Sequence, residues 1–186
     1  METSGRLGPF GEAPMRSAGT LWITVLLGLV LAGCGAVSHD ATLLANYVPD
    51  PGSRIEVGTV TNATGQVPKV DDEVVNIEQL LSDALAEKLR GEGLLWAGDP
   101  SRKLVLVTQI VEYEPGDAFK RWLLPGWGST VVSVEGELRD ANQLVGTVRA
   151  RRTVSFGGAY TIGAWRTIFA SVADDVVSEL QSKLRK

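Results

Sequence analysis

The chain has 186 residues, of which 22 are acidic and 18 are Lys or Arg, and its formal net charge at pH 7 is −4. It contains a single cysteine, so intramolecular disulfides and cysteine-rich metal sites are excluded. Nucleic-acid binding is disfavoured too, because neutralising phosphates needs clustered Lys and Arg and the sequence has no basic run. We therefore expect no nucleic-acid partner and no metal centre.

A short apolar run occupies residues 20–30 and carries no charged side chain. It has the length of a signal-peptide core and is too short for a comfortable membrane span. The motif LAGC follows at residues 31–34 and resembles the lipobox of bacterial lipoproteins. The resemblance implies cleavage between Gly33 and Cys34, with a diacylglycerol on the Cys34 thiol. An ordinary transmembrane anchor is the alternative for this part of the chain.

The lipobox defines the expected organisation of the N-terminal region. Residues 1–33 are predicted to be a lipoprotein signal peptide, and translation could start at Met15, where a complete leader already begins. Apart from the acyl lipid on Cys34, which would anchor the mature protein in a membrane, no cofactor is expected. Gly35 stands where Asp would signal inner-membrane retention in many Gram-negative bacteria. We therefore expect the periplasmic face of the outer membrane.

The segment after the lipobox is expected to separate the anchor from the folded part. Residues 34–53 are predicted to be a lipidated tether, and residues 54–186 a single periplasmic domain. The only histidine, His39, falls within this tether. We interpret His39 as a solvated linker residue, in preference to a catalytic group or metal ligand.

The folded part opens with a predicted strand at Arg54, in the segment RIEVGTVTN. A helix is predicted over residues 73–90, because apolar residues recur there at spacings of three to four. These residues are Ile77, Leu80, Leu81, Ala84, Leu85 and Leu89. Asp71, Asp72 and Glu73 lie at the expected helix N-terminus, which explains three adjacent acids better than a cation site does.

Three further strands are predicted, at residues 103–113, 130–139 and 144–156. The first is apolar on both faces over its first half, which indicates an interior strand. The other two alternate between apolar and polar residues, as expected for strands with one solvated face. Arg152 interrupts the apolar face of the last strand, so we expect a β-bulge there or the end of the buried stretch.

The connection between the last two strands is predicted from matching their faces. A three-residue loop at residues 141–143 keeps both apolar faces together, whereas a two-residue loop would set inward residues opposite outward ones. The preferred register places Glu135 opposite Arg149. Glu135 and Glu137 also have the spacing of a paired-carboxylate site, but we interpret them as part of an ion-paired solvent face.

The last element is a helix predicted over residues 165–184, with the strongest apolar stripe in the chain. With an optional short strand in the segment LLWAG at residues 94–98, the element order is β-α-(β)-β-β-β-α. This order favours an α/β fold of the α+β type. We expect a two-layer sandwich in which a mostly antiparallel sheet of four to five strands carries two amphipathic helices on one face.

The predicted domain contains no arrangement of residues with an obvious chemistry. Its sequence offers no Ser/His/Asp, Cys/His or multi-His set, because the single His and the single Cys both precede it. The glycines of Gly126-Trp127-Gly128 precede a strand, whereas a phosphate site needs a helix N-terminus. Gly157-Gly158 precedes a helix but lacks the rest of a phosphate loop, so we interpret it as a hinge or turn. No catalytic residue is assigned.

One connection, residues 116–130, concentrates aromatic side chains, Arg and Gly. It is the candidate partner-contact site, with a purely structural corner as the alternative. Exposure of Trp122 or Trp127 would favour the contact site, and burial of both the corner. The candidate residues are Gly116, Phe119, Arg121, Trp122, Gly126, Trp127 and Gly128.

Part of this pattern resembles a known family. Gly116, Arg121, Gly126 and Gly128, followed by a valine-rich strand and an Asp near its hairpin turn, are similar to the bacterial lipoprotein family called domain of unknown function 4410. The likeness extends from about residue 111 to the C-terminal helix. It implies an envelope lipoprotein and brings no catalytic residues, since none is assigned in the family.

These observations favour a non-enzymatic binding or assembly subunit of a cell-envelope complex. Its expected partners are membrane lipid through Cys34 and an envelope protein or further copies of itself. The alternative is an accessory subunit of an envelope system that exports lipid or polymer. An enzyme that uses only Asp, Glu, Arg or Tyr is the least favoured interpretation.

Overall fold

The computed structural model describes residues 37–98, 102–124, 126–155 and 162–185, all of which belong to one compact unit, Gly35–Lys186. Its elements in chain order are β1 (Val37–Leu43), β2 (Arg54–Asn62), β3 (Lys69–Val70), β4 (Glu73–Val74), α2 (Ile77–Gly91), β5 (Lys103–Glu114), α3 (Ala118–Leu123), β6 (Thr130–Asp140), β7 (Gln143–Val154) and α4 (Ala164–Leu184).

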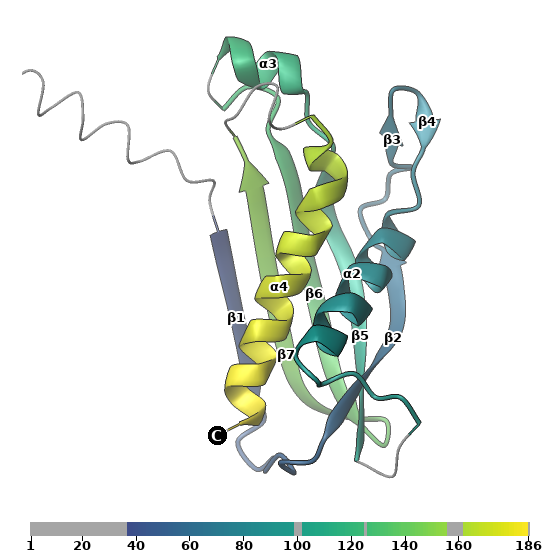
Figure 1. The fold of residues 1–186 in the computed structure, drawn as a ribbon, viewed down its shortest axis with the longest axis vertical. Helices are drawn as coiled ribbons and strands as arrows, with labels where there is room; N and C mark the ends of the chain where they lie inside the picture. Colours follow the sequence, from purple (N-terminus) through teal and green to yellow (C-terminus); the bar gives the residue numbers. More distant parts are fainter. Residues whose placement is uncertain (1–36, 99–101, 125, 156–161, 186) are drawn as a thin grey trace, which may run out of the picture. The chain divides into compact units, whose positions relative to one another are not determined.

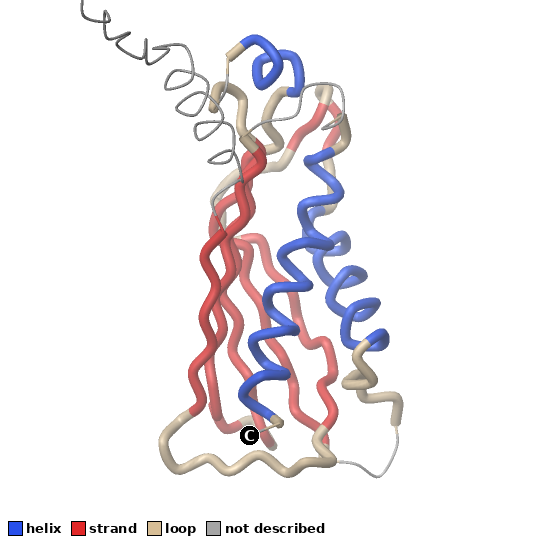
Figure 2. Tube along the Cα trace, turned by 60° about the vertical axis from the view of Figure 1, so that its left-hand side comes forward, coloured by secondary structure: helices blue, strands red, loops and turns tan. Residues whose placement is uncertain are grey.

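Five strands form one sheet in the order β1-β7-β6-β5-β2. Neighbouring strands are antiparallel except β2 and β5, which run parallel because helix α2 provides the crossover between them. Helices α2 and α4 lie side by side on one face of this sheet (Figures 1 and 2). The α+β fold, the two layers and the mostly antiparallel sheet are therefore confirmed. The interior position of β5, between β6 and β2, is confirmed as well.

The core lies between the helices and the inner face of the sheet. Each helix buries one apolar stripe there, so removing this surface from water is the main term that holds the two layers together. The largest fully buried side chains are Phe169, Ile55, Ile77, Leu81, Leu85, Leu89, Leu104, Leu106, Ile110, Leu138, Ile168 and Leu180.

Residues 37–43 are the first correction to the sequence analysis. They were expected in the tether, but they form β1 and pair along their whole length with β7, from Val37 opposite Arg152 to Leu43 opposite Gly146. Only Ala41 of this strand is buried. An edge strand with a single buried position has no apolar alternation, which is why its sequence, VSHDATL, does not indicate a strand.

The start of α2 is the second correction. The helix begins at Ile77, where the Asn76 side chain caps it by accepting a hydrogen bond from the Gln79 backbone N–H. Asp71 and Asp72 instead form the turn of the β3–β4 hairpin, with φ angles of 49° and 67°. Asp tolerates this left-handed conformation better than most residues, which explains the acids without a helix dipole.

The β6–β7 turn is the third correction. It is a two-residue loop, Ala141-Asn142, with φ angles of 45° and 73°, and it pairs Asp140 with Gln143. The predicted register nevertheless holds beyond the turn, where Glu135 lies opposite Arg149. A register shift next to Leu138 accounts for both results, because one extra residue restores the match between the two apolar faces.

His39 and Arg152 meet α4 beneath the edge strand. Arg152 Nη2 donates to Asp175 Oδ1 at 2.6 Å, and its Nε donates to the other carboxylate oxygen. His39 Nδ1 lies 3.3 Å from Asp175 Oδ1, and its Nε2 lies 3.5 Å from Glu179 Oε1. His39 is therefore part of the sheet edge, which corrects the linker interpretation. Arg152 faces inward because Asp175, only 5% exposed, is its partner.

A candidate contact site at the α3 tip

The connection between β5 and β6 carries the short helix α3 beyond the strand ends (Figure 1). Asp117 starts this helix, and its side chain accepts hydrogen bonds from the backbone N–H groups of Phe119 and Lys120, at 2.9 and 3.1 Å. The N–H of Lys120, followed by that of Phe119, lowers the pKa of Asp117. The carboxylate is thus the capping group that fixes the direction of the helix.

Arg121 holds this corner together from inside. Its side chain is 4% exposed, and Nη1 donates to the Gly128 carbonyl at 2.7 Å and to Thr130 Oγ1 at 2.8 Å. Thr130 Oγ1 in turn donates to the Pro115 carbonyl at 2.8 Å. Burial lowers the pKa of Arg121, while the Asp117 charge acts in the opposite direction. Arg121 therefore connects both ends of the loop to the first residue of β6.

Two glycines allow the guanidinium and the helix to approach so closely. Gly116 and Gly128 have φ angles of 70° and 71°, in the region that glycine adopts without strain. A Cβ atom on Gly116 would lie 2.5 Å from Arg121 Nη1, and one on Gly128 would lie 2.7 Å from Lys120 Cβ. No other residue fits at either position without moving the corner.

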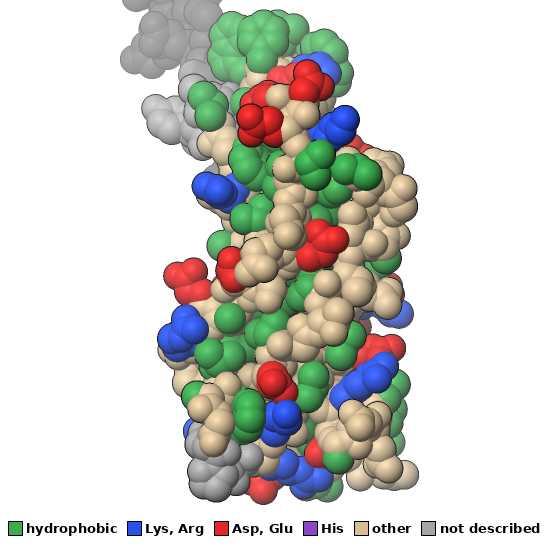
Figure 3. Space-filling view, turned by 90° about the vertical axis from the view of Figure 1, so that its right-hand side faces the viewer, with side chains coloured by type: hydrophobic (Ala, Val, Ile, Leu, Met, Phe, Trp, Pro, Cys, Tyr) green, Lys and Arg blue, Asp and Glu red, His purple; other side chains and the backbone are tan. Residues whose placement is uncertain are grey.

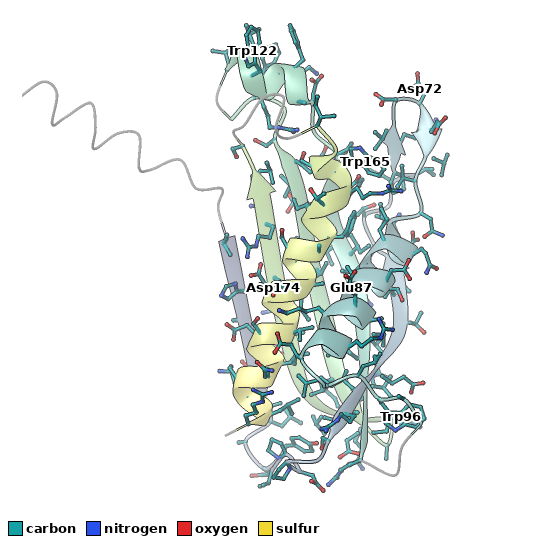
Figure 4. All side chains as sticks on the ribbon, in the orientation of Figure 1. Asp72, Glu87, Trp96, Trp122, Trp165 and Asp174 are labelled. Atoms are coloured by element: carbon teal, nitrogen blue, oxygen red, sulfur yellow. The ribbon has the colours of Figure 1, made fainter. Side chains whose placement is uncertain are left out.

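The outward side of the corner is apolar and exposed. We name it the α3 tip and define it as Phe119, Trp122, Leu123, Leu124 and Trp127. Trp122 and Phe119 are each 67% exposed and Trp127 is 48% exposed. Figure 3 shows this hydrophobic cluster at one end of the molecule, and in Figure 4 Trp122 points away from the sheet.

The tip side chains are also ordered with respect to one another. The Phe119 and Trp122 rings lie 6.0 Å apart between centroids at an angle of 34°. Lys120 Nζ lies 5.8 Å from the centre of the Trp127 ring and 3.7 Å from Asp117 Oδ2. Lys120 and Asp117 balance each other's charge on the exposed side of the corner, and the charge of Arg121 is buried on its inner side.

The structure brings together all seven residues that the sequence singled out in this loop. Gly116, Arg121 and Gly128 form its inner side, Phe119, Trp122 and Trp127 its outer side, and Gly126 turns the chain with a φ of 85°. Sequence reasoning missed Leu123 and Leu124, although the run Trp-Leu-Leu beside a Pro-Gly turn was a usable signal. The role of the loop as a partner-contact site stays a prediction.

The outer face of the sheet, away from the helices, offers no comparable surface. It carries ion pairs between Glu135 and Arg149 at 3.2 Å and between Glu137 and Arg139 at 2.5 Å, which confirms the predicted ion-paired solvent face. A depression of about 270 Å³ lies between these side chains, and Val107 and Val148 line it together with polar and charged residues. We therefore find no built ligand site on this face of the described chain.

The remaining candidates fall into two groups. Gly33 and Cys34, like Gly157-Gly158, lie outside the described residues, so cleavage and lipidation stay predictions. In the ranges that the structure describes, no three His, Cys, Asp or Glu side chains are grouped to hold a metal ion. No helix within those ranges combines the length and the apolar character needed to span a membrane.

Fold and tip together define an α+β domain, built on one five-stranded sheet, that presents an apolar surface at one end. Residues 47–158, more than half of the chain, match the family described as Domain of unknown function (DUF4410). The chain belongs to this family. No curated protein matches the chain.

Two solved PelC structures share this fold at low identity. The chain resembles a point variant of the PelC dodecamer from Paraburkholderia phytofirmans, with 20% identity, a TM-score of 0.52, and coverage of 78% of this chain and 98% of that one. A PelC dodecamer from the same organism in another crystal form, at 20% identity, has a TM-score of 0.50, and the match covers 79% of this chain and 97% of the PelC chain. The chain is also similar to a DUF330 protein from Xanthomonas campestris, at 15% identity and with a TM-score of 0.44; the match covers 76% of this chain and 96% of the DUF330 protein.

Proposed function

We propose that this protein is a lipid-anchored, non-enzymatic binding and assembly subunit of a cell-envelope complex, held at the periplasmic face of the outer membrane through Cys34. The observation that carries this proposal is the α3 tip. Five apolar side chains are exposed on a corner that Arg121 and two glycines hold rigid. An exposed cluster of large apolar side chains on a rigid support is typical of a contact surface.

The chemistry of the charged residues supports a non-enzymatic role. The acids of the outer sheet face are paired with Arg, and Asp175 is paired with Arg152 beneath β1. The described part of the chain therefore offers contacts more readily than acid–base catalysis.

Self-association is part of the proposal. The PelC structures that share this fold are dodecamers. Among the described residues, the outer edge of β1 is unpaired, and so is that of β2 beyond its bridge between Ile55 and Leu95. Such edges can pair with further strands. A multimer also supports the second candidate function, an accessory subunit in which a ring of copies engages an export channel. Mass measurement of the detergent-solubilised lipoprotein tests this part, since a monomer would contradict it.

The contact surface is tested in intact cells with a photoreactive amino acid at position 127. Position 143, an exposed residue at the opposite end of the sheet, provides the matched control. We expect a covalent adduct, protein or lipid, at position 127 and none at position 143. Equal labelling at both positions, or no adduct at 127, would contradict a contact role for the tip.

The anchor is tested separately with Cys34→Ala. Removing the thiol removes the site of lipid attachment, so the variant should no longer fractionate with the outer membrane. Mass spectrometry of the unaltered protein should find the mature chain beginning at Cys34 with acyl chains attached. A variant that still fractionates with the outer membrane would refute the lipid anchor.

A further inference from the structure

The direction of β1 places the start of the folded domain at the same end of the sheet as the tip. Val37, the first residue of β1, pairs with Arg152 of β7, and Arg152 pairs with Val132 of β6. Two residues further along β7, Val154 pairs with Thr130, whose hydroxyl accepts a hydrogen bond from Arg121. Figure 1 shows the start of β1 and α3 toward the same end of the sheet.

The covalent chain limits how far an anchor on Cys34 can lie from this end. Three residue steps separate Cys34 from Val37, so the span is at most roughly 10 Å at about 3.3–3.6 Å a residue. The opposite end of the sheet lies a whole strand away. For β6, with 11 residues, that length is roughly 35 Å at about 3.4 Å a residue. A lipid on Cys34 therefore brings the tip end of the domain, and not the far end, to the membrane.

The tip has the composition of a membrane-interface anchor. Trp side chains favour the boundary between lipid headgroups and acyl chains, where an apolar ring can be buried while its N–H stays near water. Phe119, Leu123 and Leu124 add apolar surface, and Lys120 has a long side chain that can keep its charge among the headgroups. The balanced charges of Asp117 and Lys120 leave burial of apolar surface as the main driving force.

The size of the tip also favours lipid over a protein partner. It consists of five apolar residues on one six-residue helix and the following turn. A stable protein interface uses roughly 20–30 residues a side. A bilayer interface needs no complementary shape, so a small convex apolar tip is sufficient to enter it.

We propose that the α3 tip inserts into the headgroup region of the same membrane leaflet that holds the lipid of Cys34. This inference rests on the lipid anchor in the proposed function and names the bilayer as the partner of the tip. The protein is then attached at two points, the acyl chains and the tip. The sheet axis stands away from the membrane, and the far end, with the Ala141-Asn142 turn, faces the periplasm.

The depth of the tip in a bilayer can be measured on the full lipidated protein. Because Cys34 is the only cysteine and its thiol is blocked by lipid, one new cysteine can be labelled with a nitroxide. Leu123→Cys and Leu124→Cys report on the tip, and Gln143→Cys is the control on the far end. All three positions are exposed, so labelling should leave the fold intact.

In vesicles of phosphatidylethanolamine and phosphatidylglycerol, we expect labels at 123 and 124 to collide several-fold more with oxygen, relative to a water-soluble nickel chelate, than the label at 143. Equal accessibility at the three positions in vesicles would overturn the inference. Labels exposed in vesicles but shielded in native membranes would also overturn it, while leaving a protein contact at the tip. A protein that failed to associate with vesicles would refute the anchor itself.

Discussion

The buried guanidinium of Arg121 donates a hydrogen bond to the side chain of Thr130, so the exposed tip and the first residue of β6 form one rigid unit. The apolar side chains of α3 are exposed at a fixed position, and only the inner side of the corner is responsible for holding them there. Stability and contact are thus assigned to different residues of one loop, which allows them to be tested separately.

Replacing Arg121 with Met should destabilise the protein, because the Gly128 carbonyl and Thr130 hydroxyl lose a charged donor in a buried setting. We expect a loss of roughly 1–3 kcal/mol in the free energy of unfolding, measured by urea denaturation. Lys120→Met, the exposed neighbour, should change it by less than about 0.5 kcal/mol. Equal effects of the two substitutions would show that Arg121 does not hold the corner.

Asp175→Asn should loosen edge strand β1. The substitution leaves the Arg152 guanidinium without its buried carboxylate, at an expected cost of roughly 1–3 kcal/mol in unfolding free energy. Amide hydrogen exchange of residues 37–43 should accelerate as well. Asp174→Asn is the control, because this neighbouring acid is half exposed and its ion pair with Lys88 lies at the surface, where solvent screens it. Unchanged exchange in β1 would contradict the link between α4 and the edge strand.

Glu112 should contribute a small, pH-dependent stabilisation. Hydrogen bonds from Arg151, at 2.9 and 3.1 Å, lower the pKa of Glu112 below its ordinary value of 4.5, against a smaller opposing effect of burial. A lowered pKa means that the stabilisation is present above pH 4.5 and is lost as the pH falls through the folded-state pKa.

Glu112→Gln should therefore reduce the unfolding free energy near pH 7 and have little effect under more acidic conditions, below the folded-state pKa. Both partners are substantially exposed, so solvent screening limits the effect to about 0.2–1 kcal/mol. Urea denaturation of the variant and the unaltered protein across this pH range measures the difference. A constant difference at all pH values would rule out the ion pair as its source.

The β6–β7 turn should accept a stabilising substitution. Ala141 adopts a φ of 45°, a conformation that costs an L-residue with a Cβ more than it costs glycine. We expect Ala141→Gly to stabilise the protein by about 0.5–1 kcal/mol, observed as a higher urea midpoint. Asn142→Gly should change little, because Asn already tolerates the left-handed region. Destabilisation by Ala141→Gly would argue against the two-residue loop.

The parts of the fold that the sequence predicted are those with many buried positions in a regular pattern. Helices α2 and α4 show an apolar residue every three to four positions, and strands β6 and β7 show one at every second position. These spacings are visible in the sequence because one face of each element is buried. Edge strand β1 could not be predicted in this way, since only Ala41 is buried. The two-residue turn was missed because a bulge near Leu138 compensates for it. Matching the apolar faces of the two strands gives the total number of unpaired residues between them and does not say whether they lie in the turn or in a bulge.

The candidate site was predictable in composition but not in arrangement. The cluster of Gly, Arg and Trp in residues 116–130 marked the loop as special. Sequence alone could not decide that Arg121 points inward and Trp122 outward, because both lie in a helix of six residues whose two sides have no regular pattern. Asp175, the partner of Arg152, could not be recognised as buried for a related reason, because a residue of a buried ion pair looks in sequence like any exposed polar residue.

Burial of the α3 tip in the membrane that holds the lipid of Cys34 can be measured by thiol accessibility in cells. Leu123→Cys and Gln143→Cys are each expressed in the full chain, and the outer membrane is permeabilised to a membrane-impermeant maleimide. If the tip lies in the membrane, position 143 is labelled rapidly and position 123 is strongly protected, and the protection is lost when the membranes are dissolved in detergent. Equal labelling at both positions before detergent is added would contradict it.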